Sequence, residues 1–166
     1  MMNKNKRKIF LLSGFSGSGK DTIADILVKY KNFKKIAFAD ELKKLASIIT
    51  EIKINNFYDI TVKNNYRHVL IDISKHEKEK DKLIFVKPII NMIKKNKNIN
   101  YVISDLRYEE ELIKMKKEFP NCIAVWIDRE INNEKCDDIK LRKKDCDSSL
   151  PNNSSINESE IIKFFE

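Results

Sequence analysis

A glycine-rich stretch near the amino terminus carries the residues that are best suited to chemistry. The stretch reads Gly14, Phe15, Ser16, Gly17, Ser18, Gly19 and Lys20. It matches the G-x-x-x-x-G-K pattern, in which backbone N–H groups cradle phosphates and the lysine reaches the β- and γ-phosphates. The whole chain has three glycines, and all three lie here. The pattern predicts that residues 14–22 bind ATP and that Lys20 acts as a catalytic cation.

The two residues after this loop depart from the general pattern, which places a Ser or Thr hydroxyl on Mg²⁺. This chain has Asp21 and then Thr22. A carboxylate can ligate Mg²⁺ directly or through water, but it also brings negative charge close to the phosphates. A threonine hydroxyl is the alternative ligand, and the sequence leaves the choice between the two open.

Two further candidates follow an apolar run at residues 100–104. Asp105 stands where an acid could hold Mg²⁺ through water, and its alternative role is to cap the next helix. Arg107 can contact a phosphate through two N–H groups of its planar guanidinium. The alternative for Arg107 is a surface ion pair with Glu110 or Glu111. These residues alone leave the two roles of Asp105, and the two roles of Arg107, open.

Arginine is scarce in this chain, and its positions are therefore informative. Only five of the 33 basic residues are arginines. Arg67 suggests planar recognition of an acceptor phosphate, although a helix-surface charge is the simpler alternative. Arg129 follows an apolar run and is assigned to the adenine or lid side of the nucleotide site. Arg142 lies in a polar stretch and is a candidate lid arginine.

The elements that must position these residues alternate along the chain. We expect strands at residues 8–13, 35–39, 100–104 and 122–127. We expect helices at residues 21–30, 40–50 with Asp40 as cap, 64–73, 81–95 with a kink or a second start at Pro88, and 108–119, then a short final helix capped by Ser159. Residues 129–155 read as a polar, mobile lid. Alternation of this kind predicts one α/β domain over residues 1–166, a parallel sheet between two helical layers, with ligands at the carboxyl ends of the strands.

Composition narrows the classes of protein that the chain can represent. The net charge is +8, but lysines are spread along the chain among Asp and Glu, so we predict no nucleic-acid groove. Cys122, Cys136 and Cys146 form no disulfide or zinc pattern, which favours a reducing cytoplasm. No stretch reaches the ~20 apolar residues of a membrane helix, and we expect no membrane partner.

Four stretches together resemble a known family. They are Ser-Gly-Lys-Asp-Thr at 18–22, Phe-Ala-Asp-Glu-Leu-Lys at 38–43, Tyr-Arg-His-Val-Leu at 66–70, and Ile-Ser-Asp-Leu-Arg at 103–107 with glutamates at 109–111. In this order they resemble the deoxynucleoside monophosphate kinases of bacteriophages and other DNA viruses, over roughly residues 8–127. The loop and the Ser-Asp-x-Arg stretch are also similar to animal-type phosphomevalonate kinases.

The resemblance implies a P-loop kinase fold and transfer of a phosphoryl group from ATP, with Mg²⁺, to a deoxynucleoside monophosphate. It implies that Asp40, Lys43 and Arg67 face this small-molecule nucleotide and that Arg107, with Asp105, belongs to the catalytic set. The alternatives are that Asp40 only caps its helix and that Lys43 is a solvated surface lysine. The resemblance also implies a cytoplasmic enzyme, in the host cytoplasm if the protein is viral. The alternatives are a phosphomevalonate kinase and a degenerate protein that binds ATP without turnover. The preferred base, the choice of deoxy or ribo sugar and the oligomeric state, a homodimer included, stay open.

Overall fold

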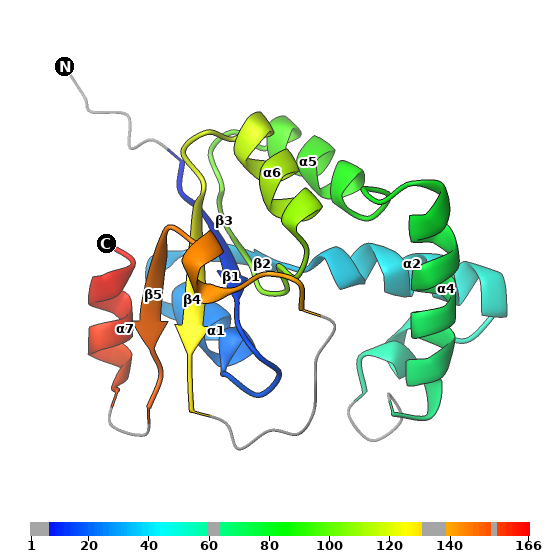
Figure 1. Cartoon of the computed structure of the whole chain (residues 1–166), viewed down its shortest axis with the longest axis horizontal. Helices are drawn as coiled ribbons and strands as arrows, with labels where there is room; N and C mark the ends of the chain where they lie inside the picture. The colour runs from blue at the N-terminus through cyan, green and yellow to red at the C-terminus, as the bar shows by residue number, and fades with distance from the viewer. Residues whose placement is uncertain (1–6, 60–63, 131–138, 154–155) are drawn as a thin grey trace.

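A parallel sheet forms the centre of the computed structural model, which describes residues 7–59, 64–130, 139–153 and 156–166 (Figure 1). In these residues the sheet has five strands in the order β2-β3-β1-β4-β5, and every neighbouring pair is parallel. The strands are β1 Ile9–Ser13, β2 Phe33–Ile36, β3 Asn100–Ile103, β4 Ile123–Asp128 and β5 Ser148–Pro151.

Both faces of the sheet are covered by helices, which explains why the central strands β1, β3 and β4 are apolar on both sides. Alternate side chains of β1 enter two different clusters: Ile9 and Leu11 face one helical layer, and Phe10 and Leu12 face the other. The first layer contains α5 Val86–Lys95 and α6 Glu109–Glu118, and the second contains α1 Lys20–Lys31 and α7 Glu158–Phe164. The predicted three-layer α/β/α architecture is therefore confirmed.

A helical arm extends to one side of the sheet (Figure 1). We define the arm as α2 Phe38–Thr50, the 3-10 turns η1 Ile54–Phe57 and η2 Asn64–Tyr66, and α4 Arg67–Lys80. α2 packs against both η1 and α4. None of the α4 side chains is fully buried, so this helix lines the arm rather than the core. The arm carries the three residues that were predicted to face an acceptor.

The start of α2 differs from the sequence-based prediction. β2 ends at Ile36 rather than at residue 39, and α2 begins at Phe38 with Ala37 as its N-cap. Asp40 is the third helical residue, and its carboxylate accepts a hydrogen bond from the Ala37 N–H. Carboxylates satisfy the N–H groups of residues 37–39, and this lets the helix begin two residues early.

The helix predicted over residues 81–95, with a kink or a second start at Pro88, begins only at residue 86. α4 continues to Lys80, a turn follows in which the Leu83 N–H donates to Asp81, and α5 begins at Val86. Pro88 lies in the first turn of α5, where a helix tolerates the missing N–H. The second of the two alternatives for Pro88, a new helical start, is the one the structure shows.

The stretch predicted as a polar, mobile lid contains regular secondary structure among its described residues. Within the predicted lid, the structure has the 3-10 turn η3 Lys143–Asp145 and the strand β5, which is short, polar and paired with β4. Within the predicted lid, residues 131–138, with Cys136, and residues 154–155 lie outside the described residues. The cap of α7 is Asn157, not Ser159, because the Asn157 side chain accepts the Glu160 N–H at 3.0 Å. Of the helices described, none has the length and apolar character that crossing a bilayer requires.

Candidate active site

The glycine-rich loop joins the carboxyl end of β1 to the amino end of α1. Its lysine folds back over the loop: the Lys20 Nζ donates to the carbonyl oxygens of Gly14 at 2.6 Å and Phe15 at 2.8 Å. The Ser18 N–H donates to the Phe15 carbonyl at 3.1 Å and closes the turn. Loop, lysine and the positive end of α1 thus form one cradle that favours a phosphate.

Two of the loop glycines have a steric reason to be glycine. Gly19 has φ +93°, and a Cβ there would lie 2.3 Å from the Asn152 Nδ2. Gly14 has φ +136°, and its Cβ would lie 2.5 Å from the Ile127 carbonyl oxygen. A side chain at either position would combine an unfavourable backbone conformation with a collision.

The outer side of the loop is held by residues that follow β4 and β5. The Asn152 Nδ2 donates to the Ser18 carbonyl at 2.6 Å, while its backbone N–H donates to the Asp128 carbonyl at 2.7 Å. The Arg129 guanidinium donates to the Gly17 carbonyl at 3.3 Å. Sequence reasoning placed Arg129 near the nucleotide but missed Asn152, which is 134 residues from its partner and belongs to no motif.

Asp21 meets the end of β3. The Ser104 hydroxyl donates to Asp21 Oδ1 at 3.1 Å, and the Lys35 ammonium lies 3.0 Å from the same oxygen. Burial acts to raise the pKa of Asp21, but the hydrogen bond and charge of Lys35, with the Ser104 hydrogen bond, outweigh it and lower the pKa. Thr22 is exposed on α1. The Asp21 carboxylate and the Ser104 hydroxyl therefore lie together beside the loop.

Asp105 connects the end of β3 to the start of α2. Its two carboxylate oxygens accept the backbone N–H groups of Phe38 and Ala39, each at 2.8 Å. Burial raises the pKa of Asp105, although these two hydrogen bonds and the Arg107 charge act to lower it. The helix that Asp105 caps is α2, not the next helix along the chain as the alternative supposed.

The Arg107 side chain is exposed, and the hydrogen bond that Glu111 makes with this residue is to its backbone. The buried Glu111 accepts the N–H groups of Arg107 at 3.0 Å and Tyr108 at 3.2 Å. In the described residues neither candidate glutamate pairs with the guanidinium, because Glu110 pairs with Lys82 and Glu111 with Lys78. The alternative of a surface ion pair with these glutamates is not what the structure shows.

The arm brings two of its three predicted residues together and adds a third. The Tyr58 hydroxyl donates to Asp40 Oδ1 at 2.9 Å, and the Lys43 ammonium lies 3.6 Å from that oxygen and 3.8 Å from the Tyr58 ring centroid. Arg67 is exposed at the first residue of α4, and its guanidinium forms no ion pair with a described residue. Sequence reasoning missed Tyr58 because no motif includes it.

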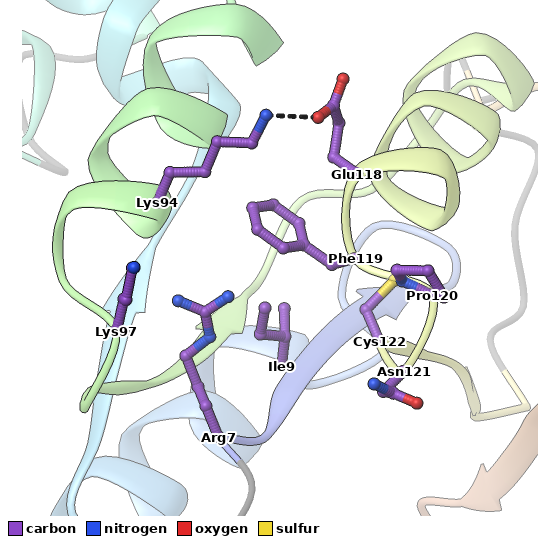
Figure 2. A pocket seen from close by; sticks show the side chains of 9 residues that line it. All are labelled: Arg7, Ile9, Lys94, Lys97, Glu118, Phe119, Pro120, Asn121 and Cys122. Atoms are coloured by element: carbon purple, nitrogen blue, oxygen red, sulfur yellow. Dashed lines mark hydrogen bonds and ion pairs between the residues drawn. The ribbon is translucent and has the colours of Figure 1, made fainter.

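A pocket also lies at the opposite end of the strands from the loop, next to the amino ends of β1 and β4. Figure 2 shows Arg7 beside the Phe119 ring, with Lys94 paired to Glu118 across the gap between α5 and α6. None of the predicted site residues lines it. In the residues described, no group of three or more His, Cys, Asp or Glu side chains could hold a metal ion.

Comparison with known proteins identifies a family. The family model described as phosphomevalonate kinase matches residues 12–121, about two thirds of the chain. No curated protein matches the sequence.

Solved structures of kinases resemble the fold. A sugar kinase from Janibacter sp. has a TM-score of 0.53 at 11% identity, covering 96% of this chain and 91% of its own. The Mycobacterium tuberculosis APS kinase in complex with AMPPNP and APS has a TM-score of 0.50 at 11% identity, covering 96% and 95%. Shikimate kinase from Aquifex aeolicus has a TM-score of 0.43 at 19% identity, covering 95% and 92%. At these identities the likeness concerns the fold alone.

Proposed function

Because the chain belongs to the phosphomevalonate kinase family, we propose that it transfers the γ-phosphoryl group of ATP to a small acceptor that already carries a phosphate. Phosphomevalonate is the first acceptor that we propose, since the family model is described by that substrate. The observation that carries the proposal is the loop over residues 14–20, with the Lys20 ammonium folded onto it at the amino end of α1.

The proposed reaction demands alignment more than acid–base chemistry. An oxygen of the acceptor phosphate, already anionic, forms a bond to the γ-phosphorus while the bond to the β–γ bridging oxygen breaks, and ADP leaves with those electrons. Lys20 neutralises charge on the transferring group, and the loop N–H groups hold the β-phosphate. Arg129 and Asn152 hold the outer side of the loop, where we place the nucleoside end of ATP.

Mg²⁺ fits the oxygen donors beside the loop. The Asp21 carboxylate and the Ser104 hydroxyl lie together near the proposed phosphates, and Asp21 Oδ1, which accepts the hydroxyl, also pairs with the Lys35 ammonium at 3.0 Å. Mg²⁺ would therefore share this carboxylate with Lys35. Mg²⁺ commonly uses one or two protein oxygens together with phosphates and water, and it would supply charge neutralisation there. We therefore favour Asp21, with Ser104, over the exposed Thr22, and we assign Asp105 the role of positioning α2.

The acceptor lies, in this proposal, between the loop and the arm. Lys43 and Arg67 supply cations from α2 and α4, and Arg107 supplies one from the segment after β3. Asp40 holds Lys43 through the contact at 3.6 Å. Asp105 couples these groups to the sheet because it caps α2 directly from the end of β3.

A deoxynucleoside monophosphate is the second acceptor that we propose. Two motifs favour it, Phe38-Ala39-Asp40 and Tyr66-Arg67, and both lie on the arm at the starts of α2 and α4. The two acceptors share a phosphate monoester and differ in whether a base must be recognised.

A coupled ADP-release assay with Mg-ATP tests the function. The panel contains phosphomevalonate, the four common deoxynucleoside monophosphates and the matching ribonucleotides. We expect ADP release that requires phosphomevalonate and disappears in Lys20→Ala. Release that requires a deoxynucleotide instead would establish the second acceptor. No release with any acceptor, while ATP still binds, would contradict the proposal and indicate a nucleotide-binding protein without turnover.

A further inference from the structure

The buried carboxylate of Glu111 on α6 extends the proposed function and rests on it. Among the described residues, Glu111 is the only charged residue that is buried, with 4% of its surface exposed. We propose that Glu111 is a positioning residue, which fixes Arg107 for the existing phosphate of the acceptor and joins it to the arm through Lys78. The class of ligand that Arg107 meets in this proposal is a phosphate monoester.

The segment after β3 places the Arg107 backbone beside the start of the phosphate loop. The Leu106 N–H donates to the Leu12 carbonyl at 3.1 Å, and the Leu106 carbonyl accepts the Ser13 hydroxyl at 2.9 Å. Leu106 is fully buried, and Gly14 directly follows Ser13 in the chain. The residue after Leu106 therefore starts from a fixed point next to the loop.

Both polar groups of the Arg107 backbone are paired. Its N–H donates to Glu111 Oε2 at 3.0 Å, and its carbonyl oxygen accepts the N–H groups of Lys140 at 2.9 Å and Leu141 at 3.3 Å. Glu111 Oε2 also accepts the Tyr108 N–H at 3.2 Å, so one oxygen holds two consecutive N–H groups. A fixed backbone limits the directions in which the exposed guanidinium can reach, and this reduces the entropy that is lost when the side chain binds an anion.

The second oxygen of Glu111 faces the arm. The Lys78 ammonium lies 3.4 Å from Glu111 Oε1 and 3.7 Å from the centroid of the Tyr108 ring. Lys78 belongs to α4, whose first residue is Arg67. A carboxylate suits this position because it can accept from several donors at once. One buried group therefore links the helix that carries Arg67 to the segment that carries Arg107.

The neighbouring glutamate provides a contrast. Glu110 pairs with Lys82 at 3.0 Å, and the two side chains are 45% and 74% exposed. Exposed pairs of this kind contribute little, because water and salt screen their charges. Glu111 and its partner Lys78 lie mostly out of water, where charges interact more strongly. Of these two adjacent glutamates, Glu111 is the one that is suited to hold the chain in place.

A helix cap by itself requires less than Glu111 provides. Glu111 is the third residue of α6, where a glutamate commonly accepts the N–H of the N-cap residue. Glu160 has the same position in α7, where it accepts the Asn157 N–H at 3.0 Å and is exposed. Glu111 is buried, pairs with the arm and reaches one residue further back, to Arg107 itself. These additional contacts carry the proposal.

The test compares Glu111→Gln, Lys78→Met and Arg107→Met with the double variants Glu111→Gln/Arg107→Met and Lys78→Met/Arg107→Met. Glutamine keeps an oxygen acceptor for the two N–H groups and removes the charge that faces Lys78. Glu110→Gln is the matched control at the adjacent, more exposed position, and Glu160→Gln is the control for a cap in α7. The readouts are acceptor kcat/KM, ATP KM, acceptor affinity by calorimetry and urea denaturation, with phosphomevalonate and the deoxynucleotides as acceptors.

We expect Glu111→Gln to lower acceptor kcat/KM and acceptor affinity about five- to tenfold, because Arg107 is held less firmly, while ATP KM stays within about twofold. Lys78→Met should lower them about threefold, because the carboxylate loses its partner on the arm. In the Arg107→Met background either change should have less than about a twofold effect, because there is then no guanidinium to position. Glu110→Gln and Glu160→Gln should change each constant by less than about twofold.

The outcomes separate this inference from the proposed function. If the wild-type protein transfers phosphate, or only binds an acceptor, and folded Glu111→Gln behaves like Glu110→Gln, the inference is wrong and the function stands on its own evidence. Equal losses in the wild-type and Arg107→Met backgrounds, or an ATP KM that rises in parallel, would also overturn it, since they indicate a general structural role.

If Glu111→Gln does not fold, the Lys78→Met variants decide by the same comparison. Absence of both turnover and acceptor binding in the wild-type protein would overturn both proposals.

Discussion

Residue pairs that are remote in the sequence hold the phosphate loop in shape. The side chain of Asn152 occupies the space that a Cβ at Gly19 would need, and it donates to the Ser18 carbonyl. The loop backbone is therefore determined by its own glycines and also by the residue that follows β5. The effects of substitutions at Gly19 and at Asn152 on stability should therefore depend on each other.

At this scale we predict that Gly19→Ala lowers the free energy of unfolding by about 1–3 kcal/mol, because alanine is strained at φ +93° and collides with Asn152. Asn152→Ala should cost about 1 kcal/mol through its lost hydrogen bond. The double variant should lose less than the sum, because the shortened Asn152 relieves the collision. Urea denaturation of all four proteins measures this coupling. Additive losses would show that the collision does not contribute.

At the scale of elements, carboxylates cap the starts of two helices. Asp105 at the end of β3 accepts the N–H groups of Phe38 and Ala39 in α2, a different element. Glu111 belongs to α6 itself and accepts the N–H groups of Arg107 and Tyr108 just before that helix. Both carboxylates have raised pKa values because burial disfavours their charged forms. The arm is thus attached to the end of β3 through Asp105, a carboxyl group whose charge depends on pH.

We predict that Asp105→Asn destabilises the protein by about 1–3 kcal/mol, because an amide leaves one buried N–H without an acceptor. The difference should depend on pH. The folded-state pKa of Asp105 lies above its unfolded value of 3.8, so the folded protein binds the proton more tightly. The contribution of Asp105 to the wild-type free energy of unfolding therefore falls as pH rises from 3.8 through the folded-state pKa. Because asparagine does not titrate, the difference in free energy of unfolding between the wild-type protein and Asp105→Asn narrows over this range. Chemical denaturation at several pH values measures this difference, and a difference that widens with pH would contradict the raised pKa of Asp105.

The cap of α7 gives a second prediction for an element. Asn157→Ala should lower the free energy of unfolding by about 1 kcal/mol, because it removes the acceptor of the Glu160 N–H. Ser159→Ala is the control: Ser159 is exposed in the first turn, and its change should stay within about 0.5 kcal/mol. Thermal and urea unfolding measure the free energy of unfolding of Asn157→Ala and of Ser159→Ala. A larger loss for Ser159→Ala would favour the cap that the sequence suggested.

At the scale of the whole molecule, two apolar layers on opposite faces hold the sheet. Phe165, just after α7, is 2% exposed and meets Phe10 of β1 edge to face at 4.8 Å. Its neighbour Phe164 is 38% exposed. The carboxyl-terminal helix is therefore part of the layer that also contains α1, the helix that follows the phosphate loop.

We predict that Phe165→Ala costs about 3–5 kcal/mol, because it leaves a cavity between α7 and the sheet. Phe164→Ala should cost about 1 kcal/mol, since much of that ring is already in water. Both variants replace a phenylalanine by alanine at adjacent positions, so the difference between them reports the burial of the ring rather than the type of substitution. Guanidinium denaturation monitored by circular dichroism measures both values, and similar losses would contradict the assigned packing of α7.

The sequence by itself determined the features that depend on neighbouring residues. The apolar run of β1, the glycine loop, Lys20 and the following helix are contiguous, so their periods and residue types predict a phosphate cradle without tertiary information. Alternating strands and helices likewise predict the three-layer architecture. β5 escaped prediction because its four residues are mostly polar and only Leu150 is buried.

Only the tertiary structure decided which distant residues meet. The N–H groups of Phe38 and Ala39 meet a carboxylate 67 and 66 residues away, and Ser18 meets an amide 134 residues away. Tyr58 reaches Asp40 across a helix and a turn. Contacts of this kind depend on the order of the strands in the sheet and on how the arm packs beside it. They produce no hydrophobic period and no fixed residue spacing that could be recognised in the sequence. The loop could therefore be found from sequence, whereas the contacts that Asn152 makes with it and that Asp105 makes with α2 could not.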